Sequence, residues 1–208
     1  MRDLRTRTSL IVLTAGLAVT LTACGGSDDP STVSAPSSNA SSTPGAAQTV
    51  DGISTEHNDA DITFITDMTP HHKGAVAMAE LAGTRASNPK VKDLAQRILA
   101  AQQPELDKMA SMAKAWGVTL DDTASGMGGM SGMSGGGMDE DVTALTPLSG
   151  AAFDKEFLTR MIAHHEGALP MAQADLDAGV NPQAKTLAQG IITTQKAEIT
   201  EMKGLLTA

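Results

Sequence analysis

The sequence TDMTPHHKGAVAMA, at residues 66–79, occurs a second time as TRMIAHHEGALPMA at residues 159–172. The similarity extends beyond this motif, because residues 61–109 align with residues 154–202 without a gap, with 20 of 49 positions identical. Unrelated segments of ordinary composition would share roughly three residues over such a length. The chain therefore contains an internal duplication, and the repeated motif carries four of its five histidines.

Each copy has the pattern of a helical hairpin. Apolar residues recur at alternating steps of three and four, which places them on one face of a helix. Asn88-Pro89 and its counterpart Asn181-Pro182 each offer an N-cap followed by proline at the first helical position. The pattern predicts helices at residues 58–85, 89–116, 149–178 and 182–206. Two such hairpins bury their apolar faces most simply as an all-α four-helix bundle.

The first part of the chain is expected to direct export. Residues 1–23 begin with three arginines and continue with an apolar run that is short for a membrane span. The sequence Leu-Thr-Ala-Cys that ends at Cys24 resembles the lipobox of bacterial lipoproteins, and Cys24 is the only cysteine. We expect a cleaved lipoprotein signal peptide, a lipid anchor on Cys24 at the outer face of a bacterial membrane, and a disordered Ser/Pro/Gly tether at residues 24–53.

The folded domain is predicted at residues 54–208, with repeat 1 at 58–116, a linker at 117–148 and repeat 2 at 149–208. Within the linker, GMGGMSGMSGGGM at residues 126–138 has too much glycine to hold a helix and is predicted to be a long, mobile crossover. It is either a tolerated low-complexity linker or an auxiliary thioether trap for a soft ion such as Cu(I). Its methionines are Met127, Met130, Met133 and Met138.

Composition excludes several classes of function. The net charge is −9 for the full chain and −11 without residues 1–23, which argues against nucleic acid as a partner. A single cysteine leaves no internal disulfide and no Cys-based zinc or iron–sulfur site. Any bound metal must therefore be held by histidine, methionine and carboxylate side chains.

Hairpin geometry predicts which side chains meet, because residues equally far from the loop of an antiparallel pair lie at the same height. His71 is expected to face Gln102 and Glu105, with Met68 beside Glu105 and within about two turns of Met109. The two copies form either one central layer or two separate sites. The equivalent residues of the second copy are Met161, His164, Gln195, Glu198 and Met202.

Glu105 and Glu198 lie on otherwise apolar stripes, where an unpaired carboxylate costs several kcal/mol or takes up a proton. A histidine across the hairpin or a bound cation would compensate each of them. Di-iron bundles place Glu three residues before His, whereas this chain places Met there, and thioether sulfur favours copper over iron. Zinc or iron, and a metal-free Glu–His network, remain alternatives. The predicted ligands are Met68, His71, His72, Glu105, Met109, Met161, His164, His165, Glu198 and Met202.

The helix Met68-x-x-His71-His72-x-x-Ala75-x-x-Met78-Ala79 and its second copy resemble the hallmark of the domain of unknown function 305 family. The resemblance implies a ferritin-like four-helix fold in an exported or membrane-tethered bacterial protein, with some members associated with copper binding outside the cytoplasm. It supports the methionine and the two histidines of each motif as candidate ligands.

These observations predict an extracytoplasmic lipoprotein that binds copper and buffers it or passes it on, without catalytic turnover. One alternative is a metal oxidase with a ferritin-like centre at Glu105, Glu198 and the histidines. Another is a metal-free interaction domain whose His–Glu network only specifies packing.

Deletion of residues 126–138 is expected to leave the helical circular dichroism signal unchanged, because the segment contributes nothing to the predicted core. A loss of that signal would contradict the assignment of the segment as a linker.

Overall fold

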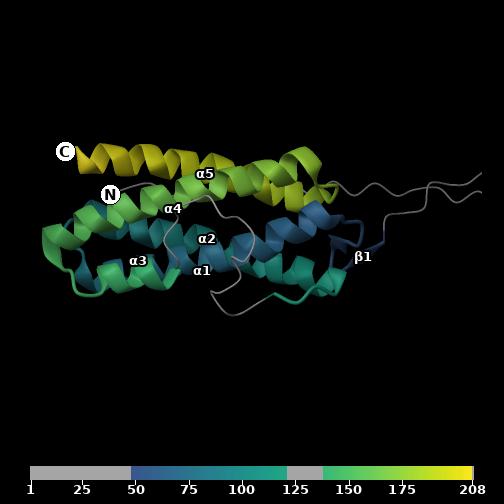
Figure 1. The fold of residues 1–208 in the computed structure, drawn as a ribbon, viewed down its shortest axis with the longest axis horizontal. Helices are drawn as coiled ribbons and strands as arrows, with labels where there is room; N and C mark the ends of the chain where they lie inside the picture. The colour runs from purple at the N-terminus through teal and green to yellow at the C-terminus, as the bar shows by residue number, and fades with distance from the viewer. Residues whose placement is uncertain (1–47, 121–137, 208) are drawn as a thin grey trace, which may run out of the picture. The chain divides into compact units, whose positions relative to one another are not determined.

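Four long helices, two from each copy of the duplicated segment, form the fold of this computed structural model, which describes residues 48–120 and 138–207 (Figure 1). The helices are α1 (Asp59–Arg85), α2 (Pro89–Trp116), α4 (Gly150–Ala178) and α5 (Pro182–Leu206). α1 packs along α2, α4 packs along α5, and the two hairpins meet mainly through α1 and α4. The expected all-α bundle of two duplicated hairpins is confirmed, with helix bounds close to the predicted ones.

The helices begin where the sequence carries capping residues. Asn58 accepts hydrogen bonds from the amides of Ala60 and Asp61, while the Asp61 carboxylate accepts one from the Asn58 amide, which completes a capping box. Asn88 and Asn181 cap α2 and α5. These caps satisfy amides that a helix start otherwise leaves unpaired, so each hairpin loop ends at a defined residue.

Three short elements were not predicted from the sequence, and the two strands include residues 49, 50 and 53, which were predicted as disordered tether. β1 (Thr49–Val50) pairs antiparallel with β2 (Ile53–Ser54), and the turn between them places Asp51 and Gly52 at positive φ, as a two-residue hairpin requires. α3 (Met138–Leu145) lies within the segment predicted as linker and packs against α1, with Leu145 fully buried. Its eight residues give too short an apolar pattern to be identified without the surface it covers.

Several predictions lie outside the described residues. They are the signal peptide at 1–23, the lipidated Cys24, the tether up to residue 47, and Met127, Met130 and Met133 of the crossover. Met138 begins α3. None of the helices in the described part of the chain is long and apolar enough to cross a membrane.

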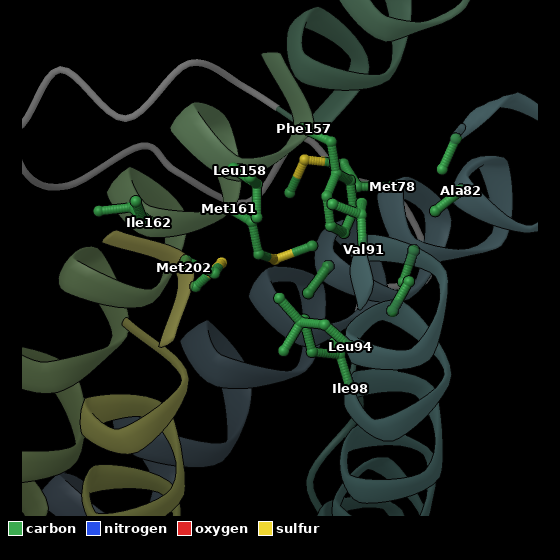
Figure 2. Close-up of a cluster of buried hydrophobic side chains, with 14 of the residues drawn as sticks. Met78, Ala82, Val91, Leu94, Ile98, Phe157, Leu158, Met161, Ile162 and Met202 are labelled. Carbon is green, nitrogen blue, oxygen red and sulfur yellow. The ribbon is translucent and has the colours of Figure 1, made fainter. Parts of the chain in front are cut away.

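The apolar core consists of two clusters, and each combines residues from both repeats. In the first, Met161 and Met202 of repeat 2 pack with Leu94 and Ile98 of repeat 1 (Figure 2). In the second cluster, repeat 1 supplies the methionines and repeat 2 the aliphatic residues. Met68 and Met109 pack there with Leu187 and Ile191. Since each cluster needs both hairpins, we do not expect either repeat to keep its core when separated from the other.

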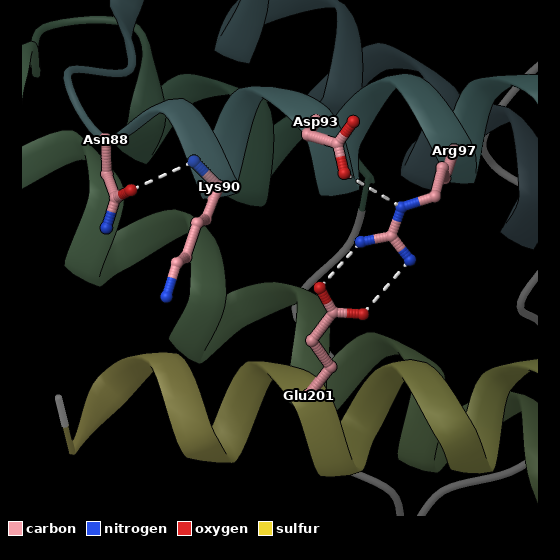
Figure 3. A network of polar contacts seen from close by, with 5 residues as sticks. All are labelled: Asn88, Lys90, Asp93, Arg97 and Glu201. Atoms are coloured by element: carbon pink, nitrogen blue, oxygen red, sulfur yellow. Dashed lines mark hydrogen bonds and ion pairs between the residues drawn. The ribbon is translucent and has the colours of Figure 1, made fainter.

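Exposed ion pairs add to the contact between α2 and α5. Arg97 binds Glu201 through two hydrogen bonds of 2.6 and 3.0 Å and Asp93 through one of 3.2 Å (Figure 3). The Arg97 side chain is 48% exposed, so water and salt screen these interactions and their contribution to stability is small. The core, not this network, determines how the hairpins pack.

A pair of equivalent carboxylates ties each hairpin loop to the opposite repeat. Asp154 accepts hydrogen bonds from the amides of Ser87 (3.0 Å) and Asn88 (2.9 Å) and from the Ser87 hydroxyl. Asp61, its equivalent, accepts hydrogen bonds from the amides of Val180 (3.1 Å) and Asn181 (3.0 Å). Each loop of one repeat therefore depends on a buried side chain of the other.

The two carboxylates differ in their third partner. Val180 has no hydroxyl where the first repeat has Ser87, and Asp175 stands where the first repeat has Ala82. Asp175 is buried beside Asp61, and burial, followed by the charge and hydrogen bond of Asp61, raises its pKa to about 7, while Lys185 acts in the opposite direction. Below that pKa, Asp175 holds a proton and carries no charge beside Asp61.

This proton makes stability depend on pH. The pKa of Asp175 rises from 3.8 to about 7 on folding, so its stabilising contribution is complete below pH 4 and is lost as the pH rises through 7. The side chain of Asp175→Asn can donate a hydrogen bond at any pH. From pH 5 to pH 8, the free energy of unfolding of the wild type is therefore expected to fall by roughly 2 kcal/mol more than that of the variant. Denaturant unfolding at both pH values measures this difference.

The matched control is Asp177→Asn, an exposed position on the same helix, which is expected to keep the wild-type pH dependence. An Asp175→Asn protein that follows the wild type at both pH values would show that no proton is held there.

Candidate metal centre

The four histidines of the duplicated motif, which we call the histidine layer, lie where α1 meets α4. The rings of His71 and His164 are in contact, with centroids 3.8 Å apart and planes inclined by 49°. The ring of His71 also lies close to Gly167, where a Cβ atom would be 3.4 Å from His71 Nε2, which is ordinary van der Waals contact. The contact joins the equivalent histidines of the two repeats, so the histidines of both copies lie in one layer, while their methionine pairs belong to two separate apolar clusters.

The second histidine of each motif faces its own hairpin partner. His72 Nε2 lies 2.8 Å from Glu105 Oε2, and His165 Nε2 lies 2.7 Å from Glu198 Oε2. Because an ionised carboxylate only accepts hydrogen bonds, the imidazole N–H donates in both pairs. Both rings are fully buried, so each glutamate has the compensating histidine that the sequence required.

This pairing corrects the prediction that His71 and His164 face the glutamates. Adjacent residues differ by only about 1.5 Å in height but by about 100° around the helix axis. Height along the hairpin therefore does not show which of the two adjacent histidines faces the glutamate. The direction of each side chain around the helix axis determines its partner. His72 points toward α2 and His71 points toward α4, a helix that the hairpin argument did not include.

Burial keeps the two contacting histidines neutral. Desolvation, followed by the charges of His72 and His165, lowers the pKa of His71 to about 3. Desolvation and then the other histidines of the layer lower the pKa of His164 well below its ordinary value. At neutral pH both rings have an unprotonated nitrogen, which is the form that binds a metal ion.

The layer holds an unusual concentration of unpartnered polar atoms. Asp175 aside, all buried side-chain nitrogens and oxygens without a hydrogen-bond partner in residues 48–120 and 138–207 belong to six duplicated residues. They are Nδ1 of His71, His72, His164 and His165, and both amide atoms of Gln102 and Gln195. Buried polar groups normally have partners, so these atoms indicate a partner that the protein itself does not supply.

The predicted methionine ligands lie on both sides of the histidine layer. Met68 and Met109 belong to one apolar cluster, where the Thr69 hydroxyl lies 3.7 Å from the Met109 sulfur. Met161 and Met202 belong to the other cluster (Figure 2). All four are fully buried, and packing alone accounts for their burial.

Within the described residues, no three His, Cys, Asp or Glu side chains form a group that could hold a metal ion. An ion in this layer would therefore need thioether or amide donors besides the histidines. The residues present fit that requirement for a soft ion, because neutral imidazoles lie between two pairs of buried thioethers. The same residues are a poor fit for a hard ion that is held only by carboxylates.

The fold and the central layer together define a class of protein: a duplicated helical bundle whose two halves meet through paired histidines. The chain belongs to the domain of unknown function 305 (DUF305) family, whose model matches residues 61–206. No curated protein sequence matches the chain.

Solved structures of the family resemble the chain over most of their length. A DUF305 fragment from Deinococcus radiodurans is 28% identical over 72% of this chain and 97% of its own, with a TM-score of 0.63. A putative secreted DUF305 protein from Streptomyces coelicolor is 30% identical over 71% and 92%, also with a TM-score of 0.63. CopM in its Cu(I)-bound form is 33% identical over 71% and 95%, with a TM-score of 0.59. CopM also has Cu(II)-bound and silver-bound structures.

The buried glutamates offer a test of the layer in the metal-free protein. Glu198→Leu removes the partner of His165 Nε2 and leaves both ring nitrogens unpaired, which is expected to lower the free energy of unfolding by about 1–3 kcal/mol. Glu198→Gln keeps an acceptor oxygen and should lose less. Denaturant unfolding measures both variants.

Glu201→Leu is the matched control, one turn along the same helix, where loss of a screened surface pair should cost less than about 1 kcal/mol. Equal stabilities of Glu198→Leu and the wild type would mean that His165 does not depend on the carboxylate.

Proposed function

We propose that this protein binds copper outside the cytoplasm and buffers it or passes it to a partner, with the histidine layer as its metal centre. The observation that carries the proposal is the set of four histidines, two from each repeat, whose buried Nδ1 atoms have no hydrogen-bond partner. A structural network would be expected to satisfy these atoms internally. A bound ion would supply the partner they lack.

The glutamates have a different role in this proposal from the one expected from the sequence. Metal-binding histidines commonly donate their second ring N–H to a carboxylate, which holds the ring and its tautomer. His72 and His165 have this arrangement, with Nε2 bound to glutamate and Nδ1 free. We therefore assign Glu105 and Glu198 to orient the ligands, while the histidines and the methionines Met68, Met109, Met161 and Met202 supply the donor atoms.

Copper is the preferred metal for two reasons. Imidazole and thioether donors together suit copper better than magnesium, calcium or manganese, which prefer oxygen. The similar protein CopM binds Cu(I), Cu(II) and silver, and silver shares with Cu(I) a preference for soft donors. The chemistry of the buried residues and the known ligands of a relative thus favour the same kind of ion.

The location is proposed from the chain's beginning and from its relatives. The export signal and the lipobox at Cys24 would tether the domain to the outer face of a bacterial membrane. The similar Streptomyces coelicolor protein is described as a putative secreted protein, which supports export. The methionines of residues 126–138 would then be available to capture copper and deliver it to the bundle.

Titration of the metal-free protein with Cu(I), Cu(II), Zn(II) and Fe(II) tests the proposal. Copper is expected to bind preferentially and to raise the melting temperature, because a ligand that binds only the folded state stabilises it. The double variant His71→Ala/His164→Ala should lose at least about 100-fold in copper affinity, since it removes two ligands and the ring contact that positions the others.

His57→Ala is the control, since His57 stacks on Trp116 outside the layer and has no counterpart in the second repeat. Binding of no metal by the wild type would leave a purely structural bundle. Preference for Fe(II) with consumption of oxygen would instead favour an oxidase.

A further inference from the structure

We propose that Gln102 and Gln195 are further ligands of the metal centre, each supplying an amide oxygen beside the methionine pair of the opposite repeat, and that they determine its affinity for Cu(II). This inference rests on the proposed function, because it concerns the same buried layer. It adds residues that the histidine motif does not contain and a basis for distinguishing the two oxidation states of copper.

Three contacts fix the heights of the four helices relative to one another. His72 with Glu105 sets α2 against α1, His165 with Glu198 sets α5 against α4, and the His71–His164 contact sets α1 against α4. At about 1.5 Å per residue along each helix, Gln102 lies within about one residue's rise of Met161 and Met202. The same reasoning places Gln195 level with Met68 and Met109.

The apolar clusters support this register independently. Ile98, one turn before Gln102 on α2, packs in the cluster that contains Met161 and Met202 (Figure 2). Ile191, one turn before Gln195 on α5, packs in the cluster that contains Met68 and Met109. Each glutamine thus lies at the height of the thioethers of the other repeat, about one turn or less from the nearest histidines along the bundle axis.

Both glutamines are strongly buried and have no partner in the protein. Each is 2% exposed, and neither the amide oxygen nor the amide nitrogen of either residue makes a hydrogen bond. Burying an amide in this way opposes folding, and an apolar side chain of similar size would avoid the cost. The neighbours on the same stripes, such as Ile98 and Met202, are apolar, so nothing in the packing requires glutamine.

The chemistry of the amide explains what it adds. Thioether sulfur is a soft donor that suits Cu(I), whereas Cu(II) prefers nitrogen and oxygen donors in a tetragonal arrangement. Histidine nitrogens and methionine sulfurs alone would favour the reduced ion. An amide oxygen at each end of the layer supplies a harder donor, so the oxidised ion gains more from the glutamines than the reduced ion does.

Replacement of the glutamines by leucine separates this role from a structural one. In Gln102→Leu/Gln195→Leu, the metal-free protein is expected to melt at or above the wild-type temperature, because unpaired polar atoms leave the core. Affinity for Cu(II), measured by competition with a chelator, should fall at least tenfold, while affinity for Cu(I) should stay within about threefold. The electron paramagnetic resonance spectrum of bound Cu(II) should change.

The exposed neighbour Gln103 provides the control, and Gln103→Leu should bind both ions as the wild type does. The single variants Gln102→Leu and Gln195→Leu each keep one glutamine. If the two glutamines act independently and equivalently, each single variant should show about half of the change in the Cu(II) spectrum that the double variant shows.

The outcomes distinguish this inference from the proposed function. A wild type that binds no copper overturns both. A wild type that binds copper, together with a double leucine variant of unchanged Cu(II) affinity and spectrum, overturns only the role of the glutamines. A large drop in the melting temperature of the metal-free variant also overturns it, because the amides would then have partners within the fold.

Discussion

The contact between His71 and His164 is the constraint on which the rest of the bundle depends. It joins α1 to α4 through equivalent residues, so it sets the height at which the two hairpins meet. Desolvation, followed by the charges of neighbouring histidines, lowers the pKa values of His71 and His164, whose ring centroids lie 3.8 Å apart. A protein built on such a contact has neutral nitrogen donors at its centre at physiological pH.

Around this contact, the bundle places polar side chains where a purely structural core would be apolar. The histidine layer, its glutamates and the two glutamines accompany two clusters of aliphatic and methionine side chains within one bundle. A buried polar network of this kind is weak support for stability, because an apolar core of the same volume is often at least as stable. Its presence in both repeats is the feature on which the proposed metal centre rests.

The duplication also explains how the two halves hold each other. Asp61 and Asp154 each bind the loop of the opposite repeat, and each apolar cluster takes residues from both hairpins. The repeats have nevertheless diverged at one end, where Asp175 and Val180 replace an alanine and a serine. A hydroxyl that donates at any pH has been exchanged for a carboxyl that donates only when protonated. The equivalent ends of the bundle therefore respond differently to pH.

Much of this structure was accessible from the sequence, because it depends on local chemistry and on the repeat. The apolar period predicted the helices, the Asn-Pro pairs predicted where two of them begin, and the duplication predicted a bundle of two hairpins. The amphipathic stripes showed that Glu105 and Glu198 need buried partners. The reciprocal binding by Asp61 and Asp154 was missed, although both are identical between the copies, since identity alone does not say what a side chain contacts.

The sequence by itself determined the helices and their pairing into hairpins, because these follow from periodicity and from distance along the chain. Only the tertiary structure decided which histidine of each pair faces the glutamate and which faces the other repeat. That choice depends on the direction of each side chain around its helix and on the position of α4. Two neighbouring residues differ little in height but widely in direction, and only the packing of the helices distinguishes them.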